Sequence, residues 1–176
     1  MRHIKGLLIG LTGLFLVVTI LSLLIPSKVI TVRSVVVHVP PGRIMEQIAN
    51  LKNWKNWHPV FMKEPGVIYS EPSTGVKAFA VWTSNEKVNK ILITEINESG
   101  IKFLLLRKNE KDVENILSVR PTQDSTGLQV EWKTLTHLKW YPWDKFAGIF
   151  VDKMTGPGYE AALTSLQQYL QQQPVS

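Results

Sequence analysis

The most apolar part of the chain is an uninterrupted run near its N-terminus. Residues 6–25 read GLLIGLTGLFLVVTILSLLI and contain no charged side chain. A helix rises about 1.5 Å per residue, so this run would extend about 30 Å, the thickness of a bilayer's hydrocarbon core. Pro26 follows directly and cannot donate a backbone hydrogen bond, so we expect the helix to end there. The pattern predicts a transmembrane anchor over residues 1–26.

A cleaved signal peptide is the competing interpretation of this run. Signal peptides have an apolar core of about 7–15 residues and small residues before the cleavage site. This run is longer, and residues 23–26 (LLIP) contain no Ala-x-Ala-like site. We therefore favour an anchor. Arg2 and Lys5 precede the run, and a short basic tail tends to stay cytoplasmic, so we expect residues 27–176 on the non-cytoplasmic side of the membrane.

Beyond Pro26 the pattern changes to short segments rich in β-branched and aliphatic residues. Such segments, bounded by turn residues, are typical of β-strands, and short gaps between them favour hairpins and an antiparallel meander. Residues 28–39 (KVITVRSVVVHV) form the first predicted strand. Six more are predicted over residues 67–70, 77–83, 88–97, 101–108, 112–120 and 128–137.

Helical periodicity occurs in two places. Residues 43–51 place Ile44, Ile48 and Leu51 at helical spacing, so a short helix is expected after the first strand. Near the C-terminus, residues 144–154 and 159–172 each carry an apolar stripe. Gly156-Pro157-Gly158 separates these two stripes, and we expect it to interrupt the helix. The soluble part is therefore α+β and forms one domain over residues 27–176.

Composition and charge exclude several kinds of function. The chain has no cysteine, so disulfides, thiolate nucleophiles and cysteine-ligated metal sites are ruled out. Its net charge of +6 comes from scattered residues rather than a basic stripe, so we expect no nucleic-acid partner. No two of the four histidines, His3, His38, His58 and His137, have metal-ligand spacing, and we expect neither a metal nor another cofactor.

The order of elements and several local motifs resemble the SRPBCC superfamily, in its polyketide cyclase/dehydrase-like branch. The resemblance covers residues 28–172. Its motifs are the Pro40-Pro41-Gly42 entry to the first helix, the L-x-x-W-x-x-W segment from Leu51 to Trp57, and the C-terminal helix that follows Gly156-Pro157. The resemblance implies a START-like helix-grip fold, in which a curved antiparallel sheet of about seven strands wraps around a long C-terminal helix. It also implies a cavity for a hydrophobic small molecule or lipid.

Aromatic side chains are the main candidates for lining such a cavity, because concave sites for apolar ligands are lined by rings and fixed by a few polar groups. The resemblance implies that Trp54 and Trp57 border the cavity mouth. His58, which follows Trp57, is either a polar group at the cavity rim or a histidine of a surface loop. Core packing is the alternative for Trp82 and Trp132. The candidate ligand-binding residues are Trp54, Trp57, His58, Trp82, Phe103, Trp132 and Phe150.

Several alternatives remain open at this stage. Glu95 and Glu131 lie in the middle of strands, and an inward carboxylate would suit general acid–base chemistry in a cyclase-like enzyme. No catalytic residue is assigned, because no nucleophile motif is present. A structural envelope protein with a packed interior is a third possibility.

The residues Trp140, Tyr141 and Trp143 form either an interfacial aromatic belt or a cover over one end of the sheet. Gly6 and Gly10 have the small-xxx-small spacing of paired membrane helices, so a weak homodimer is an alternative to a monomer.

Overall fold

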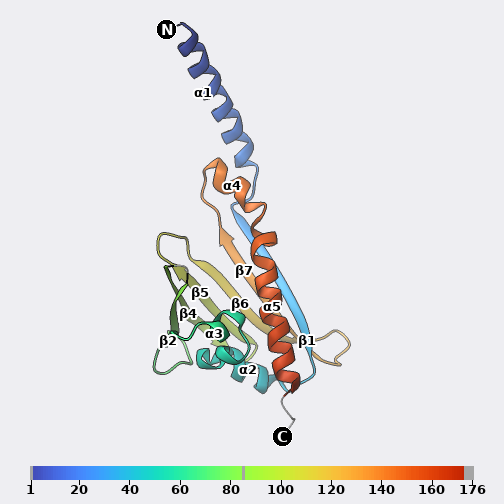
Figure 1. Cartoon of the computed structure of the whole chain (residues 1–176). Helices are drawn as coiled ribbons and strands as arrows, with labels where there is room; N and C mark the ends of the chain where they lie inside the picture. Colours follow the sequence, from blue (N-terminus) through green and yellow to red (C-terminus); the bar gives the residue numbers. More distant parts are fainter. Residues whose placement is uncertain (1, 85, 173–176) are drawn as a thin grey trace.

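The computed structural model describes residues 2–84 and 86–172 and consists of one projecting helix and one α+β unit (Figure 1). Helix α1 (Arg2–Leu23) extends away from the rest of the chain. Within it, Ile4–Leu23 is long and apolar enough to cross a membrane, and only 6% of its most apolar window is buried. A signal sequence would satisfy the same criterion of length and composition. The core helix of a soluble protein would satisfy it too, although such a helix is mostly buried.

The α+β unit is built on one seven-stranded antiparallel sheet with the order β1-β7-β6-β5-β4-β3-β2. From β2 to β7 each strand pairs with the next in sequence, and β1 closes the sheet beside β7. The strands are β1 (Lys28–Val37), β2 (Ile68–Tyr69), β3 (Phe79–Ser84), β4 (Lys87–Asn97), β5 (Gly100–Arg107), β6 (Val113–Pro121) and β7 (Leu128–His137). This arrangement confirms the predicted meander and the seven predicted strands.

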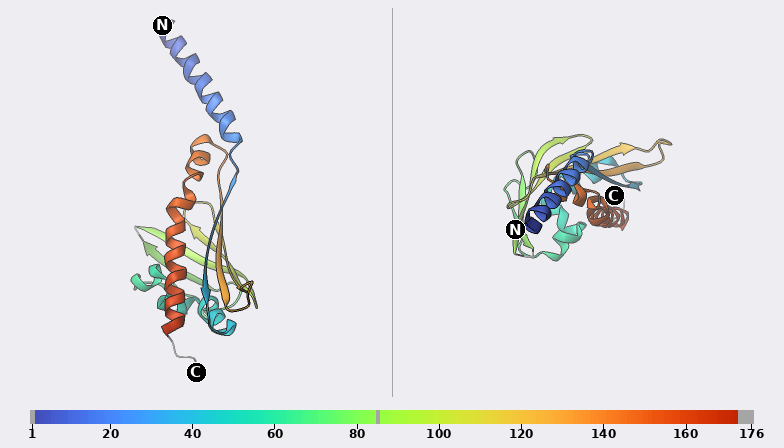
Figure 2. Two further views of the ribbon diagram at one scale, coloured as in Figure 1. Left: turned by 90° about the vertical axis from the view of Figure 1, so that its right-hand side faces the viewer. Right: turned by 90° about the horizontal axis from the view of Figure 1, so that it is seen from above.

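Five helical segments lie around the sheet. A cluster follows β1 and precedes β2, and the last two helices follow β7. The segments are α2 (Pro41–Ala49), the 3₁₀-helix η1 (Leu51–Asn56), α3 (Pro59–Lys63), α4 (Pro142–Gly148) and α5 (Val151–Gln172). Helix α5 runs along β1 and against the curved sheet (Figures 1 and 2). A curved antiparallel sheet that holds a long C-terminal helix is the helix-grip fold, as expected.

The predicted interruption of the last helix is wrong. Helix α5 continues through Gly156-Pro157-Gly158, and the break lies instead between Gly148 and Val151. Packing explains the difference. Gly156 is buried against the Arg33 guanidinium, and a Cβ there would lie 2.2 Å from Arg33 Nη2. The stabilisation that α5 gains by packing on β1 thus exceeds the cost of the one backbone hydrogen bond that Pro157 cannot donate.

An ion pair holds α5 on the first strand. Arg33 Nη2 of β1 donates to Asp152 Oδ2 of α5 at 3.1 Å, and Glu160 lies 3.9 Å from Arg33 Nε. The hydrogen bond from Arg33 lowers the pKa of the Asp152 carboxyl below its usual range. All three side chains are partly exposed, so the pair fixes the register of the helix more than it stabilises the fold.

The hydrophobic core lies between the helical cluster, α5 and the concave face of the sheet. Trp54 and Trp57, from η1, are fully buried and contact each other with ring centroids 5.2 Å apart. Their indole nitrogens donate to the backbone oxygens of Ile48 and Gln47 in α2, so both polar atoms are satisfied inside the core. The described core contains no residue of α1, which indicates that the α+β unit is stabilised by its own contacts.

Candidate functional site

A cavity of about 280 Å³ lies between the sheet, α3 and α5. Its floor comes from alternate residues of the central strands, whose side chains point to the concave face. Its sides come from α3 and from the middle of α5. The lining residues are His58, Val60, Phe61, Trp82, Ile91, Phe103, Leu105, Arg107, Asn115, Trp132, Met154, Thr155, Gly158 and Tyr159. Most of this lining is apolar or aromatic, which is typical of sites for apolar small molecules.

Aromatic rings form a continuous wall of the cavity. Phe61 contacts Trp82 with ring centroids 5.1 Å apart, and Phe103 contacts Trp132 at 5.9 Å. Trp132 in turn lies 5.0 Å from Tyr159, which connects the sheet to α5. Aromatic pairs at these separations attract each other beyond their area of contact, so the wall is held in shape without a ligand.

His58 caps helix α3, and the residue is part of the cavity lining. Its Nδ1 accepts a hydrogen bond from the Val60 backbone N–H at 3.2 Å, so the neutral ring carries its proton on Nε2. The ring stacks on Trp54 with an interplanar angle of 13°. Burial among these rings lowers the pKa of His58 to about 4. At neutral pH the residue is therefore an uncharged Nε2–H donor, and no described residue accepts a hydrogen bond from it.

Asn115 is the polar centre of the cavity floor. Neighbouring residues form hydrogen bonds with both its amide oxygen and its amide nitrogen. Its Oδ1 accepts from Trp132 Nε1 at 3.0 Å and from the Thr134 hydroxyl at 3.3 Å. Its Nδ2 donates to the Val113 backbone oxygen at 2.9 Å. This network fixes the tilt of the Trp132 ring and leaves Asn115 little capacity to bind a ligand.

Arg107 forms a charged corner of the cavity. Its Nε donates to Asn89 Oδ1 at 3.1 Å, and its Nη1 lies 3.3 Å from Glu110 Oε2. Nη2 has no partner among the described residues and remains a donor for a ligand. A second hollow of about 340 Å³ continues from here toward α4 and shares Arg107 and Tyr159 with the cavity. The Tyr159 hydroxyl also has no hydrogen-bond partner among the described residues.

The structure brings together four of the seven candidate residues. His58, Trp82, Phe103 and Trp132 all line the cavity. The remaining three do not belong to its lining.

Trp54 and Trp57, expected at the mouth, lie fully buried behind it, because their indole N–H groups bind α2. Phe150 is 55% exposed, because the chain breaks between α4 and α5 instead of at Gly156. The two strand acids also lie elsewhere. Glu95 pairs with Lys102 at 2.6 Å, and Glu131 sits between the inward residues of β7 and so lies on the opposite face.

Sequence reasoning did not identify Arg107, Asn115 or Tyr159 as site residues. Asn115 carried a recognisable signal, since it is a polar residue among the apolar residues of one predicted strand. The position of Arg107 depends on the curvature of the sheet. That of Tyr159 depends on where α5 crosses the sheet. Neither property is encoded in the local sequence pattern.

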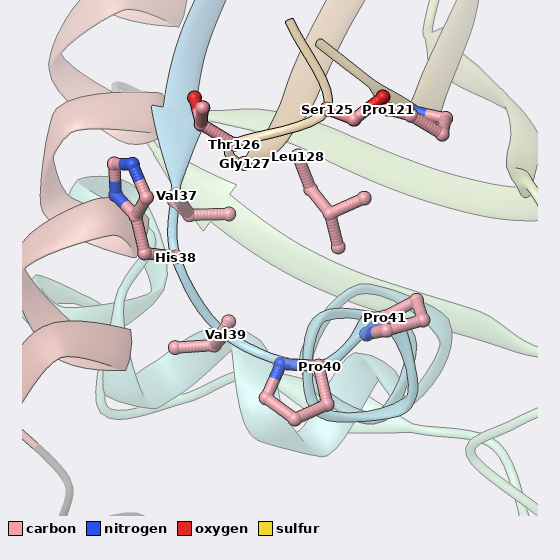
Figure 3. Close-up of a pocket in the computed structure, with 10 residues that line it drawn as sticks. All are labelled: Val37, His38, Val39, Pro40, Pro41, Pro121, Ser125, Thr126, Gly127 and Leu128. Atoms are coloured by element: carbon pink, nitrogen blue, oxygen red, sulfur yellow. The ribbon is translucent and has the colours of Figure 1, made fainter.

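A different hollow of about 370 Å³ lies at the far end of β1 (Figure 3). Figure 3 shows two facing segments, residues 37–41 and the β6–β7 turn from Pro121 to Leu128. His38 is the one ionisable residue in its lining, and its side chain is exposed. This surface hollow lacks the aromatic wall of the cavity. In the described residues, no three His, Asp or Glu side chains are grouped so as to hold a metal ion.

Comparison with known proteins identifies relatives by fold alone. No family model matches the chain, and no curated protein matches it. Among solved structures, SA2116 from Staphylococcus aureus, a protein of unknown function, superposes with a TM-score of 0.63 at 11% identity, over 82% of this chain and 94% of that one. A protein from Nitrosospira multiformis gives 0.58 at 16% identity, over 80% and 94%.

DynU16, a protein encoded in the dynemicin biosynthetic locus, gives 0.58 at 10% identity, over 81% of this chain and 47% of that one. Identities this low show a shared fold and leave the activity to be argued from the site.

Proposed function

We propose that the protein is a membrane-tethered, START-like domain of the SRPBCC type that binds an apolar small molecule or lipid in the cavity between the sheet and α5. One observation carries the proposal. The cavity combines an apolar, aromatic wall with polar atoms that no described residue satisfies, at His58 Nε2, the Tyr159 hydroxyl and Arg107 Nη2. Apolar walls supply affinity, and a few convergent donors fix orientation.

The size and shape of the cavity restrict the ligand class. Small-molecule sites usually measure about 300–1,000 Å³. The cavity alone, at about 280 Å³, lies just below that range, but the adjoining hollow of about 340 Å³ shares Leu105, Arg107, Thr155 and Tyr159 with it. A ligand with an elongated apolar body fits this shape. Arg107 at the junction favours a carboxylate or another polar oxygen on that ligand, because a guanidinium binds such groups well.

A binding role is better supported than a catalytic one. General acid–base catalysis works best when the pKa of the group lies near the working pH. The pKa of His58, about 4, makes it a weak base at neutral pH. Glu95 and Glu131, the acids considered from the sequence, are not part of the cavity lining. We therefore assign the cavity to ligand capture and to no reaction, and the open volume favours a ligand over a packed interior.

The proposal is tested by fluorescence transfer from the cavity tryptophans to cis-parinaric acid, an apolar carboxylate probe. Gly158 lines the cavity, and a Cβ there meets no atom within 4 Å, so we expect the side chain of Gly158→Leu to be accommodated and to take up cavity space. Ala161→Leu adds the same side chain at an exposed position of the same helix and is the matched control.

We expect saturable transfer in the wild-type protein and in Ala161→Leu, and its loss in Gly158→Leu. Equal transfer in all three proteins would contradict a ligand site in this cavity.

A further inference from the structure

We propose that residues 140–150 form a second membrane contact, in which an aromatic platform lies in the headgroup layer of a lipid bilayer beside the end of α1. The platform consists of Trp140, Trp143, Phe146, Ile149 and Phe150. This inference rests on the proposed membrane tether and adds to it a fixed orientation for the ligand cavity.

Exposure is the first observation that supports the platform. Trp140 and Trp143 are 66% and 63% exposed, and Ile149 and Phe150 are more than half exposed. Tryptophan is enriched at membrane interfaces, where its ring is apolar and its N–H reaches water. Tyr141 stacks on Trp143 with an interplanar angle of 19°, so the rings are ordered against each other.

The position of α4 identifies the bilayer as the partner. Helix α4 contacts α1 (Figures 1 and 2). Ser22, in the last turn of α1, is fully buried. Lys145 of α4 is also buried and donates to the Ile25 backbone oxygen at 2.8 Å and to Ser27 Oγ at 2.6 Å. Because α4 is attached to the last turn of a bilayer-length helix, its exposed rings lie level with the end of that span.

The local charges complement an anionic lipid surface. Lys28 begins β1 directly after the anchor and pairs in register with His137, close to Lys139. Two acids lie nearby, and both are engaged: Asp144 accepts a hydrogen bond from the Lys139 backbone N–H, and Glu114 Oε1 lies 3.7 Å from His137 Nε2. Basic side chains next to a membrane helix are attracted to anionic headgroups, whereas a protein partner would not require this arrangement.

The platform also adjoins the route into the cavity. The hollow that continues from the cavity is lined by Ala147 and Gly148 of α4 and by Val151 and Thr155 of α5. A ligand that leaves the bilayer at the platform would therefore enter between these two helices and reach Tyr159 without crossing open water.

The test uses single cysteines, since the chain contains none of its own. The full chain is placed in vesicles of phosphatidylcholine and phosphatidylglycerol, with a nitroxide spin label at Trp143→Cys or Phe150→Cys. Leu14→Cys, in the middle of α1, is the reference for lipid, and Gln123→Cys, in the exposed β6–β7 turn, is the reference for water. Collision with oxygen reports lipid, and collision with a water-soluble nickel chelate reports solvent.

We expect both platform labels to collide more with oxygen than with nickel, at a level between the two references. Platform labels that match Gln123→Cys while Leu14→Cys reads as lipid would overturn the platform and leave the proposed tether intact. If the label at Leu14→Cys is accessible to the nickel chelate, both the platform and the proposed tether are overturned. Platform labels shielded from both reagents, with dipolar broadening between copies, would show a protein interface and also overturn the inference. Binding of cis-parinaric acid by the same samples reports separately on the cavity.

Discussion

The neutral state of His58 makes a quantitative prediction for the pH dependence of stability. The folded protein lowers the pKa of His58 from 6.5 to about 4, chiefly through burial of the ring. Between these two values the unfolded chain takes up a proton at this residue and the folded protein does not. Acid therefore favours unfolding. The stability is present in full above the unfolded pKa and is lost as the pH falls toward the folded pKa.

The size of the effect follows from the shift. Each pKa unit corresponds to about 1.4 kcal/mol, so the shift between 6.5 and about 4 amounts to a loss of about 3 kcal/mol at low pH. Most of it, about 2 kcal/mol, falls between pH 7 and pH 4.5. His58→Asn removes the titration but keeps an acceptor for the Val60 N–H, because asparagine is a good N-cap.

The assay is urea unfolding of residues 27–176 at a series of pH values, followed by tryptophan fluorescence. Other acids titrate in the same range, so the informative quantity is the difference between wild type and variant. We expect His58→Asn to flatten the pH dependence by about 2 kcal/mol between pH 7 and pH 4.5. His38→Gln, at an exposed site, is the control and should keep the wild-type profile. A His58→Asn profile parallel to that of the wild type would refute the reasoning.

Two further predictions concern packing. A Cβ on Gly148 would lie 2.2 Å from Leu138 Cδ1, so Gly148→Ala should lower the free energy of unfolding by about 1–3 kcal/mol in urea titrations. Gly42→Ala, where a Cβ meets no atom within 4 Å, should change it little, and an equal loss in both would contradict the argument. Asn115→Leu leaves Trp132 Nε1 buried without an acceptor and should cost about 1–3 kcal/mol. Adding Trp132→Phe should recover part of that loss, and purely additive losses would show that the hydrogen bond is unimportant.

Sequence pattern was sufficient for the sheet because strand signals are local. Each predicted strand overlaps an observed one, since β-branched runs bounded by turn residues specify a strand and its neighbour without distant information. The antiparallel order followed from the short connections. The pairing of β1 with β7 was not predicted, because that contact joins the two ends of the domain and no local pattern specifies it.

The last helix was less predictable, because its continuity depends on a distant contact. Gly156-Pro157-Gly158 is a breaking signal by local propensity, yet α5 runs through it, and Gly156 packs there against the guanidinium of Arg33, a residue of the first strand. Local sequence also gave no sign of α3, the five-residue helix that His58 caps. Both features decide which residues line the cavity.

The candidate site was therefore predicted only in part. Residues in the middle of strands, such as Trp82 and Trp132, could be placed on the concave face by alternation alone. Trp54 and Trp57 were expected at the rim. Their burial follows from indole hydrogen bonds to α2, which depend on how two short helices pack. Phe150 lies at the surface because the chain breaks about two helical turns earlier than the sequence indicates.

Native mass spectrometry of residues 27–176 shows whether the cavity holds an apolar small molecule. The protein would be purified from cells without detergent, alongside Gly158→Leu, whose added side chain is expected to take up cavity space. We expect a co-purified apolar species on the wild-type protein and a bare mass for Gly158→Leu. The same adduct on both proteins would place the ligand elsewhere and contradict the claim.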